Sequence, residues 1–580
     1  MLFYETSLKA IWSFCSFYLI TNINFMIEYP EAKEKSIKKC VPISTQSFTE
    51  DNSARLTILL IAVTFFARIF IAAFTGLGIG ESYYFRGVLH LSLSYFDQPP
   101  LFFWLSWVST KLFGLTNLGL RFPAVLLFAG TSWLLFLITK RLFNSKAGFW
   151  AVVMMNLSAV FTIPVAAWFQ PDAPLMFFWL AATYFMVQIM LPEKHQLYTK
   201  SKTILLWTYV GICMGFATLS KYHVLFLFVG ILLFVATNKN QRHWLKHPGP
   251  YLAVFITLIF ASPIIWWNAQ NNWVSFVFQG SRAGSDGAFQ LHPDWFIRSF
   301  IGQACWILPW IWVPVIRQLW VSFKNRTTSQ AYSFVFWTSV LPLVFFTTIT
   351  LWADLQYHFH WQAPGYLMLF MPLGYAIDKN LNNPAKASST RRWVKFSAYF
   401  TIITIVFLSA HMITGFWQWY GPKYIVNKTH LGIDDPTIEG NDYNDIKTRF
   451  DQEGWSKNPK IFVGCTRWWL TGKVDWALKG KEPIVCFSWD PRNLAFLVDP
   501  GKLKGYDAVV VMQNDTTSMY QDVIPFFDKV KRVPDIVITR NGRPELHLST
   551  YYCTDFRLPK KPRPDIPAYW QLMGLPPFGH

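Results

Sequence analysis

The sequence predicts a polytopic α-helical membrane protein of about eleven transmembrane helices, followed by a soluble C-terminal α/β domain. Three observations predict this class. Of the 580 residues, 52% are apolar and only 15% are charged, which is unlike the composition of a soluble enzyme. Apolar stretches of membrane length recur from residue 56 onward. From about residue 421 the sequence becomes mixed and polar, without another such stretch.

Residues 1–55 form an N-terminal extension to which we assign no function. The stretch "LKAIWSFCSFYLITNINFMI" is apolar but interrupted by Asn22 and Asn24, and the charged "EAKEKSIKK" follows it. This pattern fits a weak signal-like segment or a mis-assigned start upstream of Met26. We expect this extension to be poorly ordered.

Residues 56–420 form the predicted transmembrane domain. Most of its apolar stretches are about 17 to 22 residues long, which is the length that a helix needs to cross roughly 30 Å of hydrocarbon. Their approximate limits are 56–77, 119–138, 147–165, 173–191, 204–220, 223–237, 251–267, 302–320, 331–350, 362–377 and 396–416.

The net charge of +19 follows from membrane topology rather than from nucleic-acid binding. One set of alternate loops carries 16 Lys and Arg against only Glu193 and Asp378. Because basic loops stay in the cytoplasm, this set lies inside and the N-terminus is cytoplasmic. These loops are 139–146, 193–203, 238–247, 321–330 and 378–395.

The opposite loops carry nearly all the acidic residues of the transmembrane domain. They are 78–118, 166–172, 221–222, 268–301 and 351–361. An odd number of spans places residues 421–580 on the same outer side. There, short apolar strands at 460–464, 483–488 and 507–512 alternate with helix-like segments at 466–478 and 517–528, which predicts a small α/β domain with a partly parallel sheet.

The cysteines indicate neither a disulfide framework nor a metal site. The seven are scattered, without a CxxC pair or a Cys/His cluster at ligand spacing. Cys465 and Cys486 could lie near each other in the soluble domain, although separate thiols are the simpler interpretation. The pair His358 and His360 could bind metal, but two ligands alone are weak support.

Three carboxylates at the outer ends of spans carry the functional hypothesis: Glu81, Asp97 and Asp172. Ionisable groups near membrane depth are costly unless they face a cavity or a partner. Asp97 in "FDQPP" and Asp172 in "FQPDAP" both lie beside prolines, which end a helix and stiffen the turn. The alternative is that each acid caps a helix or lies in water.

The stretches "GESYYFRGVLHLSLSYFDQPPLFFWL", "GLRFPAVLLFAG" and "QPDAPLMFFWLAATY" resemble the bacterial membrane glycosyltransferases related to dolichyl-phosphate-mannose protein mannosyltransferases and to the lipid A aminoarabinose transferase. The resemblance covers roughly residues 56–420. It implies a GT-C fold and transfer of a sugar from a polyprenyl phosphate on the outer side of the membrane. It also implies that an acidic residue of the first outer loop acts as, or beside, the catalytic base.

Two positions depart from the family pattern. Gly80-Glu81 stands where the family has Asp-Glu, and Gln98 stands where the aminoarabinose branch has a lysine that is implicated in binding lipid phosphate. Asp172 matches the third family carboxylate directly. We therefore predict Glu81 or Asp172 as general base, with Asp97 holding the loop or the sugar.

The leaving lipid phosphate needs positive charge or hydrogen-bond donors. Lys221 in "SKYH" matches a Ser-Lys-Tyr element of the relatives, although a snorkelling lysine would look the same. Arg86, Arg282 and His360 are further candidates, with packing as the alternative for His360. The residues predicted to line the cavity or contact the sugar are Tyr83, Tyr84, Gln98, Tyr222, His358 and Trp361.

The resulting prediction is a bacterial inner-membrane glycosyltransferase with a periplasmic α/β domain. Its partners are a lipid-linked sugar donor, a glycolipid or protein acceptor, and membrane lipid. No cofactor is required, although the sequence does not exclude a divalent cation. A transporter or flippase of lipid-linked sugars is the first alternative, but we find no inverted repeat. The second is a catalytically inactive relative that binds such a lipid, which Gly80 favours.

Overall fold

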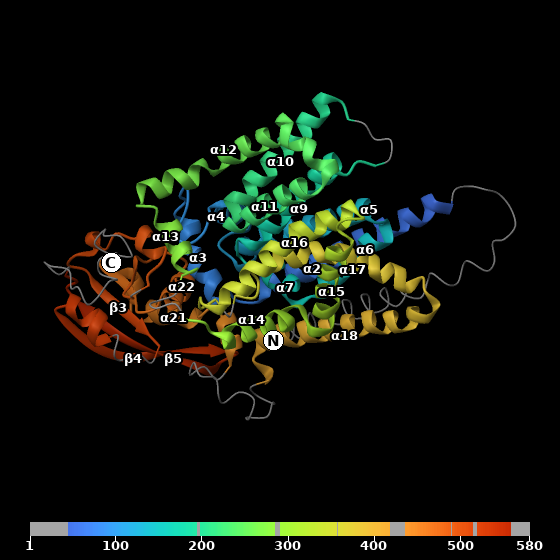
Figure 1. The fold of residues 1–580 in the computed structure, drawn as a ribbon. Helices are drawn as coiled ribbons and strands as arrows, with labels where there is room; N and C mark the ends of the chain where they lie inside the picture. The colour runs from blue at the N-terminus through green and yellow to red at the C-terminus, as the bar shows by residue number, and fades with distance from the viewer. Residues whose placement is uncertain are drawn as a thin grey trace. The chain divides into compact units, whose positions relative to one another are not determined.

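The structure is a computed structural model that describes residues 45–193, 198–284, 290–355, 358–417, 435–488, 490–513 and 519–557. Most of the predicted N-terminal extension, up to residue 44, lies outside the described residues. The helices and strands of the described part are shown in Figure 1.

The chain folds as two compact units. The first unit comprises Met1–Phe70, Phe122–Ser262 and Gly280–Val406, and the second comprises Ile71–Arg121, Pro263–Gln279 and Phe407–His580. The second unit thus combines the predicted soluble domain with the first outer loop. Where an independently folding soluble domain begins stays a prediction.

The first unit is helical. Its helices, some of which continue into the second unit, are α2 (Thr45–Phe74), α5 (Asn117–Leu142), α6 (Ser145–Leu157), α7 (Ala159–Thr162), α8 (Pro164–Ala167), α9 (Asp172–Met190), α10 (Lys200–Ser220), η1 (Tyr222–Val224), α11 (Leu225–Thr237), η2 (Lys239–Lys246), α12 (Pro248–Gln270), α13 (Val274–Ser281), α14 (Pro293–Ile307), α15 (Pro309–Asn325), α16 (Gln330–Thr348), η3 (Ile349–Leu351), α17 (Ala363–Leu381) and α18 (Pro384–Thr414).

The described helices confirm the membrane class. Seven of them are long and apolar enough to cross a membrane, and the number rises to ten if three bent pairs each count as one span. The pairs α6 with α7–α8, η1–α11 with η2, and α14 with α15 bend by 92°, 117° and 108°. These ten coincide with ten of the eleven predicted stretches. The eleventh predicted stretch is α17. Its last turns contain Asp378, Lys379 and Asn380, so its hydropathy is too low for it to count as a span by length and composition.

Helix α17 is buried among protein rather than lipid. It packs against α6, α16 and α15, and small residues allow the close approach. A Cβ added to Gly374 would come within 2.1 Å of the Ala147 carbonyl oxygen in α6, and one added to Gly365 would come within 2.6 Å of Leu343 in α16. Glycines at helix interfaces have this role in membrane bundles. The tight packing fixes the start of α17, just after residues 358–361.

The second unit contains a five-stranded mixed sheet in the order β2-β1-β3-β5-β4. The strands are β1 (Ile461–Cys465), β2 (Ile484–Cys486), β3 (Asp507–Met512), β4 (Lys529–Arg540) and β5 (Arg543–Thr554). Strand β1 pairs in parallel with β2 and β3, and β5 pairs antiparallel with β3 and β4. The predicted α/β domain with a partly parallel sheet is confirmed.

The described helices of the second unit lie before and between these strands. They are α3 (Ile79–Leu89), α4 (Leu101–Phe113), η4 (Pro436–Gly440), α21 (Asn444–Gln452), η5 (Trp455–Lys457), α22 (Trp468–Ala477), α23 (Leu494–Leu497), η6 (Pro500–Leu503), η7 (Met519–Val523) and η8 (Ile524–Phe526). Helix α22 confirms the prediction for 466–478.

One further segment agrees with the sequence prediction, and one element was not predicted. The described part of 517–528, a segment predicted to be helix-like, forms a π-helical turn at η7 followed by a 3-10 turn at η8. The β4–β5 hairpin was not predicted. Its turn is Asn541-Gly542, both at positive φ, and an Asn-Gly pair between alternating apolar residues is the signal that could have identified it.

Candidate active site

In the first unit, the carboxylate of Asp172 pairs with the ammonium group of Lys221. Asp172 lies between Pro171 and Pro174, in the first turn of α9. Lys221 directly follows the last residue of α10 and caps that helix in an extended conformation. Asp172 Oδ1 and Lys221 Nζ are 2.9 Å apart, and the two residues are 2% and 4% exposed. A helix start favours the anion and a helix end favours the cation. The structure thus brings two of the predicted site residues together.

A second group of predicted residues surrounds Arg282. Its Nη2 lies 2.8 Å from Nε2 of His358, and its guanidinium lies 4.7 Å from the ring centre of Trp361. Trp352 Nε1 donates to the Ala283 carbonyl oxygen at 3.0 Å, which ties the two outer segments together. Because arginine only donates, His358 Nε2 accepts, and the imidazole is neutral with its proton on Nδ1.

The charges of Asp172, Lys221 and Arg282 all act on the imidazole of His360. Burial, together with the nearby Lys221 and Arg282, lowers the pKa of His360 to about 4, although Asp172 acts in the opposite direction. Burial and the Arg282 charge lower the pKa of His358 to about 3. Both imidazoles are therefore neutral at neutral pH, and they can donate or accept a hydrogen bond without carrying charge.

His223 belongs to this cluster, although the sequence analysis did not single it out. Its ring stacks on Phe346 at 4.5 Å and meets Trp361 edge to face at 5.6 Å. His223 Nε2 and His358 Nδ1 are buried without a hydrogen-bond partner among the described residues. Most buried polar atoms in proteins have a hydrogen-bond partner, so these two nitrogens are places where a water molecule or a ligand oxygen can bind. The signal for His223 was its place in "SKYH", directly after Lys221 and Tyr222, the residue that begins η1.

The cluster therefore combines Asp172, Lys221 and Arg282 with three imidazoles. Lys221 and Arg282 supply the cationic hydrogen-bond donors that an anionic ligand needs. Among the described residues, no group of three or more His, Cys, Asp or Glu side chains is placed to hold a metal ion. The arrangement can bind a phosphate and supply a carboxylate as proton acceptor.

In the second unit, Glu81 is held by an arginine. Arg121 Nε donates to Glu81 Oε1 at 2.7 Å and Arg121 Nη2 donates to Oε2 at 2.6 Å, and both residues are 1% exposed. Oε2 also accepts from the Gly78 backbone at the start of α3. Arg121 further donates to the carbonyl oxygens of Thr75 and Gly76. Glu81 thus orders the beginning of the first outer loop.

Arg86 is likewise occupied by a carboxylate. Its Nε donates to Asp475 Oδ2 of α22 at 2.8 Å, and its Nη2 contacts both Asp475 and the Glu482 carbonyl oxygen. Both side chains are buried. Arg86 as a binder of donor phosphate stays a prediction, and in this structure its guanidinium joins the first outer loop to the α/β part of the second unit.

The other predicted residues of the first outer loop lie near one another. Asp97 is buried, and its charge acts on both Tyr83 and Arg492. Burial, reinforced by Asp97, raises the pKa of Tyr83. The Tyr83 hydroxyl accepts from the Asn493 backbone at 2.8 Å, and Gln98 Nε2 donates to the Tyr84 hydroxyl at 3.3 Å.

Residues 97–267 match the family model for dolichyl-phosphate-mannose-protein mannosyltransferase. Among curated proteins, the chain is 24% identical over 267 residues to the undecaprenyl phosphate-alpha-4-amino-4-deoxy-L-arabinose arabinosyl transferase of Pectobacterium atrosepticum, a match that covers 44% of this chain and 46% of the relative. A second protein of that description, from Proteus mirabilis, is 23% identical over the same shares. The chain spans about half the length of the curated relatives it matches.

Among solved structures, ArnT from Cupriavidus metallidurans bound to undecaprenyl phosphate matches with a TM-score of 0.58 at 14% identity, covering 88% of this chain and 98% of that chain. Its apo form gives the same TM-score over 87% and 98%. This likeness shows the fold and confirms the predicted fold class. The family model and the relatives confirm the resemblance seen in the sequence.

Proposed function

We propose that this chain is a multi-pass membrane glycosyltransferase that moves a sugar from a polyprenyl phosphate to a lipid, lipopolysaccharide or protein acceptor on the periplasmic side. The observation that carries the proposal is the buried Asp172–Lys221 pair, whose charges act on His360 together with that of Arg282, and two imidazole nitrogens, of His223 and His358, that have no hydrogen-bond partner among the described residues. It combines a proton acceptor with anion-binding groups, at the ends of apolar helices where a lipid phosphate lies.

The chemistry assigns a role to each group. The acceptor oxygen forms a bond to the anomeric carbon of the sugar, and the bond from that carbon to the phosphate oxygen breaks. The electron pair of that bond leaves with the polyprenyl phosphate, and the proton of the acceptor hydroxyl passes to the Asp172 carboxylate. Lys221 and Arg282 stabilise the negative charge on the leaving phosphate.

The Asp172–Lys221 contact supports an order of events. While Lys221 holds Asp172 Oδ1, that oxygen is occupied and does not face an acceptor hydroxyl. A bound phosphate competes with Asp172 for Lys221, so donor binding frees the carboxylate as the base. His223 and His358 supply neutral contacts to phosphate or sugar oxygens, and His360 lies within reach of the same charges.

Asp172 is a better candidate for the base than Glu81. Both oxygens of Glu81 accept hydrogen bonds from Arg121, which makes this carboxylate a structural group. We propose that Glu81 positions the first outer loop and that Asp97, with its charge near Tyr83, holds the loop or the sugar. The curated relatives are named for transfer of an aminoarabinose, which supports a pentosyl donor.

The experiment is mass spectrometry of envelope glycolipids and glycoproteins from a null strain, in which the gene for this protein is deleted. The null strain is compared with the same strain after it receives the wild-type gene, Asp172→Asn or the control Asp294→Asn. Asp294 is a half-exposed aspartate whose Oδ2 lies 3.5 Å from Arg298 Nη2. We expect one glycan to lose a single sugar in the null and in Asp172→Asn, and to regain it with the control. Full restoration by Asp172→Asn, at equal protein abundance, contradicts Asp172 as the base. An unchanged set of glycans in the null contradicts the transferase.

A further inference from the structure

A cavity of about 580 Å³ opens in the first unit, away from the residues of the candidate active site. It is enclosed by α15, the start of α16, the end of α17 and the start of α18. Helix α17 begins two residues after Trp361, and the part of this helix that lines the cavity, Leu373 to Asn380, lies roughly 15 to 26 Å from that start along the helix axis. The cavity therefore serves something other than the proposed transfer.

Three cations line the cavity: Arg317 from α15, Lys379 from α17 and Lys386 from α18. None of its lining residues is acidic. Within the described part of the chain, none of the three cations forms an ion pair with a carboxylate; Lys379 lies 4.4 Å from the ring centre of Tyr375 instead. The cavity is thus a concentration of positive charge that no acidic lining residue balances in the part of the chain that the structure describes.

The nearest acid in sequence, Asp378, does not neutralise this charge. It is buried, and its oxygens accept from the side-chain amides of Asn144 at 2.9 Å and Asn382 at 3.1 Å. Its hydrogen bonds hold the turn between α5 and α6 against the end of α17. The cations that face the cavity remain available to a ligand.

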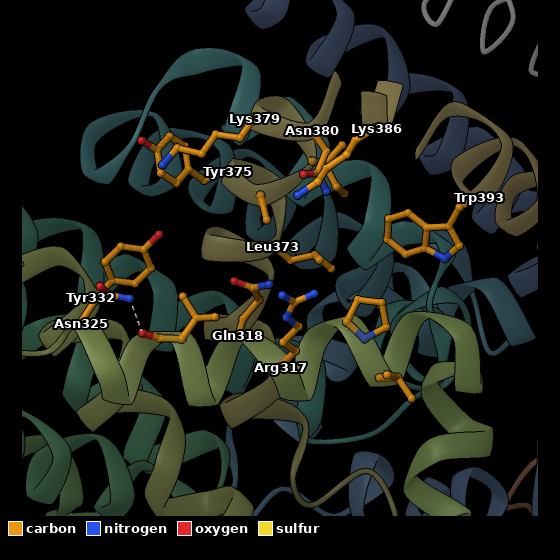
Figure 2. Close-up of a pocket in the computed structure, with 15 residues that line it drawn as sticks. Arg317, Gln318, Asn325, Tyr332, Leu373, Tyr375, Lys379, Asn380, Lys386 and Trp393 are labelled. Carbon is orange, nitrogen blue, oxygen red and sulfur yellow. Dashed lines mark hydrogen bonds between the residues drawn. The ribbon is translucent and has the colours of Figure 1, made fainter. Parts of the chain in front are cut away.

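The rest of the lining is amphipathic. Figure 2 shows Arg317 and Gln318 rising from α15 toward the side from which Asn380 and Lys386 come. Leu373 lies between them and Trp393 lies to one side, and further apolar residues of α15 and α17 complete the lining. Arg317 lies eight residues before the end of α15, about 12 Å from it along the helix axis. The cavity thus has polar groups both at the helix ends and deeper inside, at Arg317 and Gln318, with apolar walls between them.

We propose that this cavity binds the headgroup of an anionic phospholipid, with its phosphate between Arg317, Lys379 and Lys386 and the beginning of an acyl chain along Leu373 and Trp393. Basic pockets between transmembrane helices bind such headgroups. The cations lie on the helices that flank the basic connections 321–330 and 378–395, which predicts that the lipid belongs to the cytoplasmic leaflet. A free phosphate satisfies the cations but leaves the apolar walls uncovered.

The test is native mass spectrometry of the full-length protein in detergent, titrated with phosphatidylglycerol, phosphatidylcholine or inorganic phosphate. The cavity variant is Arg317→Gln/Lys379→Gln/Lys386→Gln. The control variant Lys200→Gln/Lys202→Gln/Lys324→Gln removes the same charge from exposed positions that do not line the cavity. A third variant, Ala376→Phe, fills the cavity without changing its charge. Elution as a single species on size exclusion shows that each variant is folded.

We expect wild type to retain phosphatidylglycerol in preference to phosphatidylcholine. The cavity variant and Ala376→Phe weaken this binding by about tenfold or more, and the control keeps it. Equal losses in the control and the cavity variant would overturn the site in favour of general surface charge. Equal retention of both lipids by wild type would overturn the charge recognition. Displacement of the lipid by millimolar inorganic phosphate would identify a site for free anions instead.

Discussion

The Asp172 carboxylate lies 2.9 Å from the Lys221 ammonium group, and neither side chain is more than 6% exposed. Removing one partner of a buried ion pair leaves an uncompensated charge, which costs about 3–5 kcal/mol. Removing both partners avoids that cost. The pair therefore allows stability and activity to be separated by mutation.

We predict that Asp172→Asn and Lys221→Gln each lower the apparent melting temperature, and that the double variant recovers most of the loss. Transfer activity should fall by about 10²–10⁴-fold in Asp172→Asn and stay low in the double variant, because the proton acceptor is still missing. Thermal unfolding and single-turnover transfer measure the two quantities. A double variant that recovers activity with stability would show that the pair is structural only.

Arg282 provides the second prediction. Arg282→Lys loses the hydrogen bond to His358 and the stacking on Trp361, because lysine cannot reproduce a planar guanidinium. We expect the affinity for undecaprenyl phosphate to fall by about ten- to a hundredfold, as measured by quenching of tryptophan fluorescence. The matched control is Arg298→Lys, at a half-exposed arginine, which should bind as wild type does. Unchanged affinity in Arg282→Lys argues against a role for Arg282 in phosphate binding.

The two outer histidines predict a pH dependence of stability. Their pKa values in the folded protein are about 3 for His358 and about 4 for His360, below the ordinary value of about 6.5. Between these values and pH 6.5 the unfolded chain binds more protons than the folded one, so stability falls as the pH falls through this range. Thermal unfolding of wild type and of His358→Gln/His360→Gln from pH 7.5 to pH 4.5 tests this. We expect a shallower decline in the variant; parallel curves would contradict the prediction.

The Glu81–Arg121 pair predicts a structural effect at the first outer loop. Arg121 donates two hydrogen bonds to the buried Glu81 carboxylate. Glu81→Gln should therefore lower the free energy of unfolding by about 3–5 kcal/mol. The more exposed pair Arg449–Glu453 is the control, and Glu453→Gln should change little. Guanidinium unfolding of the detergent-solubilised protein compares them. Full stability in Glu81→Gln, with transfer abolished, would instead restore Glu81 as the candidate base.

The close approach of α22 to α3 at Gly472 leads to a prediction about how these two helices pack. A Cβ at this position would lie 2.5 Å from the Tyr83 backbone, which is a contact that the backbone cannot relieve. Gly472→Ala should therefore separate the two helices and strain the Arg86–Asp475 pair, costing about 1–3 kcal/mol. Gly280→Ala, with nothing within 4 Å of the added Cβ, is the control. Equal protection of α3 from hydrogen exchange in both variants would contradict this packing.

The membrane class and the fold class could be predicted from the sequence, because they depend on local properties. Hydropathy and length identify a span within one window of sequence, and basic loops predict which ends lie together. The same reasoning predicted three short strands in a partly parallel sheet, and helix-like segments where α22, η7 and η8 lie. It missed the β4–β5 hairpin, although Asn541-Gly542 marked its turn.

The sequence identified Asp172 and Lys221 as candidate site residues because each is a charged residue near a turn. Their pairing was not predicted, because the two residues are 49 positions apart in the sequence. Arg86 shows the opposite outcome: its partner Asp475 is 389 residues away, and only the tertiary structure shows that its charge is already balanced. The sequence by itself determined which segments are apolar, which ends are basic and which groups could do chemistry. Which charges meet was decided by the tertiary structure alone, since ion pairing depends on distance and burial, and these arise only when segments remote in sequence pack together.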